Sequence, residues 1–318
     1  MKIFEITLLF LGSVIGAGFA TGAEIVTFFG DVHLPIWLIA CIIGLTMFGI
    51  IVLEIWQNHH QEQNQNTPQT KTNKMITITE IASIFIYFIL FTAMTAGVNS
   101  ITNVGITVIS LIASAGIVLF GFSKLSRINV FIVLTISVLI ISTALPHFFT
   151  GQSTVNLSWN HLPKGIFWGF LYAGLNCFMF PELIKAAAQK HKKGTLLWAG
   201  VLTAVFITIL VGLILTTIKN ADTETAPIPL LAAAPNGLTI VIILLAILTS
   251  QYTALFAIVQ RTQKFVPKLK NRPLLSMIGI CTLAFFCSFL GFNQIVNFAY
   301  PLIGAFTCVF LLISWVKH

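Results

Sequence analysis

Charged side chains are scarce in this chain. Asp, Glu, Lys and Arg together make up 8% of the 318 residues, well below the roughly 25% that is usual in soluble domains. Hydrophobic residues make up 57%, and the mean hydropathy is +0.96. This composition excludes an ordinary soluble domain. It predicts an all-α, polytopic membrane protein.

Patterns for catalysis and metal binding are also missing. The five cysteines fall inside apolar runs, with no paired spacing that would indicate a metal site or a disulfide framework. The chain has no His-Glu-x-x-His and no Gly-x-Ser-x-Gly pattern, and none of the seven histidines lies in the middle of an apolar span. We therefore expect a protein that is not an enzyme and has no organic cofactor.

Apolar runs of about 20 residues predict ten membrane spans in one domain that covers residues 1–318. They lie near residues 4–29, 34–57, 77–99, 104–122, 128–149, 165–188, 195–218, 237–260, 273–291 and 295–316. With both termini inside, all of the 17 lysines and arginines except Lys164 and Lys219 fall on the cytoplasmic side. The net charge of +8 then needs no nucleic acid, and the lipid bilayer is the expected partner.

The first span contains an unusual stretch from Leu11 to Glu24, in which four glycines precede a carboxylate. Each glycine costs about 1 kcal/mol relative to alanine in a helix, and a carboxylate inside a bilayer costs several more. A cleaved signal peptide is the rival interpretation, but polytopic proteins commonly use their first span as the insertion signal. We expect residues 16–21 to be non-helical and to line a cavity, because lipid cannot satisfy broken backbone.

A second such stretch lies about half a chain later. A shift of 158 residues places Gly16 on Gly174 and Glu24 on Glu182, next to the helix-breaking Pro181. Each half, about 1–150 and about 160–318, holds five spans, so the halves enter the membrane from opposite sides as an inverted repeat. We expect residues 174–180 to be non-helical and to face the same cavity. Two independent kinked packing helices are the alternative.

The run from Gly12 to Gly18 resembles the broken first helix of the amino acid-polyamine-organocation superfamily, whose members share the five-plus-five LeuT fold. The longer run from Ile15 to Ile25 is similar to the YkvI-type amino-acid permeases of bacteria. The resemblance implies a secondary active transporter of an amino acid or similar small zwitterion in the bacterial inner membrane. A nutrient receptor of the same fold, which binds without transporting, is the alternative.

The resemblance also implies site residues on the two broken spans. Expected substrate contacts are Ala17, Gly18, Phe19, Ala20, Thr21, Tyr172, Gly174, Asn176 and Phe178. By the same resemblance, the carbonyls of Gly12 and Ile15 and the hydroxyls of Thr249 and Ser250 would bind Na⁺. Alternatively, the two hydroxyls bond their own helix backbone. The arginine that many sodium-coupled relatives carry after the first break is absent here, and so is the lysine that some proton-coupled relatives carry in the fifth span.

Glu24 and Glu182 each follow an expected helix break. Either carboxyl can carry a proton or bind the amine of a substrate, which would make it a coupling or gating residue. Alternatively, each carboxyl accepts hydrogen bonds at a helix start, where the helix dipole favours negative charge.

Overall fold

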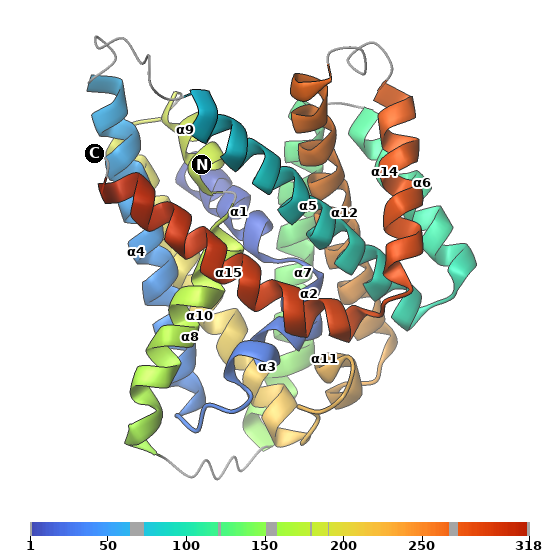
Figure 1. Ribbon diagram of the computed structural model, residues 1–318. Coiled ribbons are helices and arrows are strands. Elements are labelled where there is room, and N and C mark those ends of the chain that lie inside the picture. The colour runs from blue at the N-terminus through green and yellow to red at the C-terminus, as the bar shows by residue number, and fades with distance from the viewer. Residues whose placement is uncertain are drawn as a thin grey trace.

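The structure is a computed structural model that describes residues 2–63, 73–119, 122–150, 158–178, 180–189, 191–266 and 273–316. These residues form helices and connections, without any β-strand (Figure 1). In chain order the helices are α1 (Lys2–Val14), α2 (Ala17–Thr21), α3 (Ala23–Phe29), α4 (Ile36–Gln63), α5 (Asn73–Ile101), α6 (Val104–Leu119), α7 (Phe122–Thr150), η1 (Trp159–His161), α8 (Leu162–Cys177), α9 (Phe180–Ala188), α10 (Lys193–Asn220), α11 (Pro229–Ala233), α12 (Gly237–Phe265), α14 (Pro273–Ser288) and α15 (Phe292–Val316).

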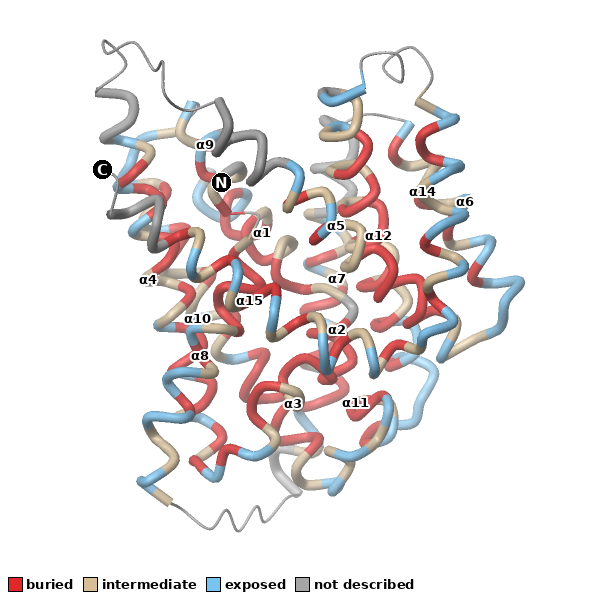
Figure 2. The backbone as a smooth tube through the Cα atoms, in the orientation of Figure 1, coloured by how far each residue is buried: buried red, intermediate tan, exposed pale blue. Residues whose placement is uncertain are grey.

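The outer surface of the helices is apolar. Large side chains such as Ile112, Phe286 and Phe298 are about two thirds or more exposed, at 67%, 66% and 76%. Figure 2 places much of the exposed backbone on the outer helices, including α6 and α14. Six helical segments are long and apolar enough to cross a membrane: Ile36–His59, Ile81–Ile101, Val130–His147, Lys193–Asn220, Gly237–Gln263 and Phe292–Leu311. The expected class, an all-helical polytopic membrane protein, is confirmed.

The remaining expected spans are shorter or divided. Val104–Leu119 and Pro273–Ser288 are apolar helices below the length of a full span. The expected span 4–29 is divided among α1, α2 and α3, and the expected span 165–188 is divided between α8 and α9.

Both helix breaks are narrower than expected. Residues 17–21 form α2, so the expectation of a non-helical stretch from 16 to 21 is wrong except at Gly16; the interruptions lie at Ile15, Gly16 and Gly22. Helix α8 continues to Cys177, so the expected loss of helix from residue 174 is also wrong. There the chain leaves the helix at Phe178, and residue 179 lies outside the described part. A glycine weakens a helix by only about 1 kcal/mol, which packing offsets readily.

The first broken segment lies inside the molecule. Helix α1 contacts α7, α8, α9 and α10, while α2 contacts α11 and α12. The longest interfaces join α10 to α4, α12 to α5 and α15 to α8. In Figure 2, the tube through α1, α2 and α3 is largely buried. The stretch from Leu11 to Glu24, which would cost the most free energy in a regular membrane helix, therefore lies in the interior of the protein.

Candidate functional site

The chain changes direction twice between α1 and α3. At Gly16 the backbone is extended, with φ −105° and ψ −174°, and at Gly22 it is left-handed, with φ 76° and ψ −6°. A left-handed backbone conformation favours glycine, because glycine has no Cβ that would clash with the following carbonyl. The Ala20 amide donates to the Gly16 carbonyl at 2.9 Å, and the Gly22 amide donates to the Phe19 carbonyl at 3.1 Å. The break thus keeps much of its backbone bonded despite the two turns.

The second break lies against the first. The rings of Phe10 in α1 and Phe180 at the start of α9 are 5.4 Å apart between centroids. On the other side of the break, the Tyr172 ring contacts Phe28 and Phe29 of α3 edge to face, with centroids 5.4 and 5.9 Å apart. Segments about 150 residues apart in sequence therefore pack together through aromatic side chains.

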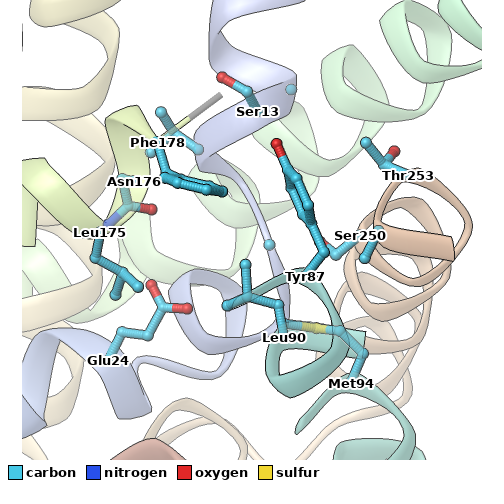
Figure 3. Close-up of a pocket in the computed structure, with 14 residues that line it drawn as sticks. Ser13, Glu24, Tyr87, Leu90, Met94, Leu175, Asn176, Phe178, Ser250 and Thr253 are labelled. Carbon is cyan, nitrogen blue, oxygen red and sulfur yellow. The ribbon is translucent and has the colours of Figure 1, made fainter. Parts of the chain in front are cut away.

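A cavity of about 80 Å³ opens beside the two breaks (Figure 3). Its walls come from α1, α3, α5, α8 and α12. The lining residues are Gly12, Ser13, Val14, Gly16, Glu24, Tyr87, Leu90, Met94, Leu175, Asn176, Phe178, Ser250, Thr253 and Ala254. A volume of this size holds several water molecules or a small solute.

Glu24 supplies the carboxylate of this cavity. The residue is 5% exposed, and its Oε2 atom has no hydrogen-bond partner within the described structure. The Asn176 amide hydrogen-bonds Glu24 and also donates to the Tyr172 carbonyl at 3.0 Å. Tyr172 and Tyr300 lie close enough to interact electrostatically with Glu24. In Figure 3 the carboxylate points toward the interior of the cavity. A buried oxygen without a partner is costly, so this atom is well placed to meet a ligand.

Two of the hydroxyls that line the cavity already donate hydrogen bonds to backbone carbonyls. Ser13 Oγ donates to the Phe10 carbonyl at 2.7 Å, and Thr253 Oγ1 donates to the Thr249 carbonyl at 2.7 Å. A hydroxyl has one hydrogen and two lone pairs, so both oxygens can only accept further hydrogen bonds. Together with Glu24 they make the polar part of the cavity rich in acceptors.

The opposite wall is apolar. Tyr87 of α5 packs against Phe178 at the second break, with ring centroids 5.1 Å apart. Leu90 and Met94 continue this wall along α5. The guanidinium carbon of Arg261 lies 5.2 Å from the Tyr87 ring centroid, but Arg261 is not a lining residue. The cavity therefore combines one carboxyl group with an aliphatic and aromatic surface.

Exposure differs among the residues around the cavity. Ser13, Phe178 and Thr253 are half-buried and belong to the cavity lining. Beyond the break, Phe19 and Ala20 are completely buried, at 0% exposure. The rings of Tyr172, Phe28 and Phe29, which contact one another, are also buried.

A buried hydrogen-bonded bridge supports the α12 wall. Ser114 Oγ of α6 donates to Gln251 Oε1 at 3.0 Å, and Gln251 Nε2 donates to Thr95 Oγ1 of α5 at 3.2 Å. All three side chains are completely buried. Gln251 thereby connects three helices one residue away from Ser250, which lines the cavity.

Comparison with known proteins adds nothing to this geometry. No family model matches the chain, and no curated protein matches it significantly. Function is therefore inferred from the site itself.

The structure brings some of the sequence-predicted residues to the cavity and leaves others outside it. Those that line it are Gly12, Glu24, Asn176, Phe178 and Ser250. Those that are buried without lining it are Ile15, Gly18, Phe19, Ala20, Thr21, Tyr172, Gly174 and Thr249. The side chains of Ala17 and Glu182 lie outside the described part of the structure.

Local contacts explain two of these outcomes. The Thr21 hydroxyl donates to the Gly18 carbonyl at 3.1 Å and accepts from the Ala23 amide at 3.3 Å, so it stabilises the bend at Gly22. A Cβ at Gly174 would lie 2.7 Å from the Gly304 carbonyl oxygen. Gly174 therefore permits close packing of α8 on α15 and does not face the cavity.

The expected sodium ligands are only partly assembled. Gly12 and Ser250 line the cavity, whereas Ile15 and Thr249 do not. The Thr249 hydroxyl donates to the Ala246 carbonyl at 2.8 Å, as in the alternative interpretation of this pair. Ser250 Oγ lies close to Gly16, since a Cβ there would be 2.9 Å from it. Sodium binding stays a prediction.

Several lining residues were missed by sequence reasoning. Tyr87, Leu90 and Met94 follow a helical spacing on α5, but their apolar side chains are indistinguishable in sequence from lipid-facing ones. Thr253 gave a usable signal, because it lies one turn after Thr249 and on one face with Ser250.

Proposed function

We propose that this protein is a secondary active transporter of an amino acid or a similar small zwitterion. The observation that carries the proposal is that two interrupted helical segments meet at one cavity that contains a buried, unpartnered carboxylate oxygen. Interrupted helices in corresponding positions of two chain halves are the best sequence pointer to a transporter's central site.

The proposed architecture is a five-plus-five inverted repeat of ten spans, with the LeuT-like arrangement of the amino acid-polyamine-organocation superfamily. It is supported by the position of α1–α3 at the start of the first half and of α8–α9 at the start of the second. The proposed location is the bacterial inner membrane with both termini in the cytoplasm, as the distribution of lysine and arginine favours.

Alternating access follows from the two sides of the cavity. In the present conformation Ser13 and Phe178 are half-buried, whereas Tyr172 packs edge to face on Phe28. Opening on the Tyr172 side would require these two rings to separate while the opposite side closes. A cation gradient would drive the cycle, with Na⁺ favoured over H⁺ because the fifth span has no lysine.

Uptake into liposomes that contain the purified protein tests this proposal. We expect a radiolabelled amino acid to accumulate when a Na⁺ gradient is imposed and to stop accumulating when the gradient is dissipated. Liposomes without protein are the control. Binding of the same solute without any accumulation would overturn transport and support a receptor of the same fold.

A further inference from the structure

The polar side of the cavity has one carboxyl group, several hydrogen-bond acceptors, and the hydroxyls of Ser250 and Tyr87, which can donate or accept. Glu24 contributes a carboxylate oxygen without a partner, and the Ser13 and Thr253 hydroxyls have only lone pairs to offer. The Asn176 amide is engaged by Glu24 and by the Tyr172 carbonyl. No lysine, arginine or histidine is found among the described residues that line the cavity. A ligand that supplies donors and positive charge would complement this surface.

We propose that the cavity selects a ligand with a protonated alkylamine group, whose ammonium binds the Glu24 carboxylate while its alkyl part packs on Tyr87, Leu90 and Phe178. This inference rests on the proposed function where it gives the amine a role in transport. The binding of the amine does not depend on that function. An ammonium has three N–H donors and no acceptor, which matches an acceptor-rich pocket.

The apolar wall favours this ligand over a bare metal ion at Glu24. Hard cations prefer a shell of several oxygen ligands on all sides. Here Tyr87, Leu90, Met94, Leu175 and Phe178 occupy a large part of the lining and offer a surface for carbon instead. A ligand with a charged head and a short alkyl body uses both parts of the cavity.

The test compares matched ligands of one size on the purified protein in detergent. The probes are n-propylammonium chloride, 1-propanol and sodium propionate, with binding measured by titration calorimetry at constant ionic strength. We expect propylammonium to bind at least about tenfold more tightly than propanol, as for a hydrogen bond to a charged group, and propionate not to bind. Equal binding of propanol or measurable binding of propionate would overturn the proposal.

Variants assign the effect to Glu24. Glu24→Gln keeps the size of the side chain and removes its charge, so propylammonium should lose its advantage over propanol. Glu54→Gln is the matched control, because Glu54 is 6% exposed on α4 and does not line the cavity; it should retain the advantage. If Glu24→Gln leaves the preference intact, or if NaCl competes with propylammonium as a ligand of similar affinity, the proposal is wrong. Amine binding without uptake would instead contradict transport alone.

Discussion

The Glu24 side chain occupies the space that a side chain on Gly18 would need. A Cβ built on Gly18 collides with Oε1, Cγ and Cδ of Glu24. The position of the Glu24 carboxylate therefore requires glycine at residue 18. The two residues lie on either side of the left-handed bend at Gly22.

Gly18→Ala should displace the Glu24 carboxylate and lower the affinity for propylammonium by about tenfold or more. Overpacking of this kind also costs about 1–3 kcal/mol of stability. Membrane insertion should be unchanged. Gly49→Ala is the matched control, because a Cβ on Gly49 has no neighbour within 4 Å. If both variants bind the amine like the parent protein, Gly18 does not hold the carboxylate in place.

Gly22→Ala should destabilise the protein by about 1–2 kcal/mol, because its φ of 76° places a Cβ too close to the following carbonyl. Thermal unfolding in detergent measures the effect. Gly279→Ala on α14 has open space around its Cβ and an ordinary helical backbone, so it should be neutral or slightly stabilising. Equal melting temperatures for the two variants would contradict a left-handed backbone at Gly22.

Ser250→Ala should raise the Na⁺ concentration needed for half-maximal uptake by at least about tenfold if sodium is bound at the first break. Thr249→Ala should have a much smaller effect, because Thr249 does not line the cavity. The double variant should then behave like Ser250→Ala alone. Uptake that ignores sodium in every variant, and follows a proton gradient instead, would remove the sodium assignment.

Amine binding should weaken as the pH falls, because a proton and an ammonium compete for the Glu24 carboxylate. Mass action allows a loss of up to about tenfold per pH unit while Glu24 is protonated. The ionisable groups that face Glu24 are the phenols of Tyr172 and Tyr300, and phenols do not ordinarily titrate between pH 5 and 8. Calorimetry from pH 8 down to the ordinary titration range of a carboxyl, near pH 4, should therefore show a loss of binding that disappears in Glu24→Gln. A dependence of the same size in that variant would assign the titration to another group.

The sequence predicted the class of the protein and the approximate position of both helix breaks, because glycine, proline and buried charge have a large local cost in a membrane helix. It did not predict the limits of the breaks. Residues 17–21 form a helix although the whole stretch 16–21 was expected to be non-helical, since contacts with α11, α12 and α3 decide their conformation.

The composition of the cavity wall was less predictable. Asn176 and Glu24 were identified because polar groups are rare in apolar runs. Met94 and Leu90 were not, since which face of α5 points inward depends on how α5 packs on α12. In the same way, the rotation of α12 about its own axis places Ser250 on the cavity and Thr249 away from it.

Helix α2 has only five residues, far fewer than the 12–15 or so that an isolated helix needs to persist in water. The cost of nucleating it is met by neighbours on α3, α11 and α12, and not by its own hydrogen bonds. Its folded state is consequently cooperative with theirs: a shift of α12 by a fraction of a turn would withdraw the support on which the whole segment depends. The helical form of the backbone at the centre of the protein therefore depends on packing from helices that lie far away in the sequence.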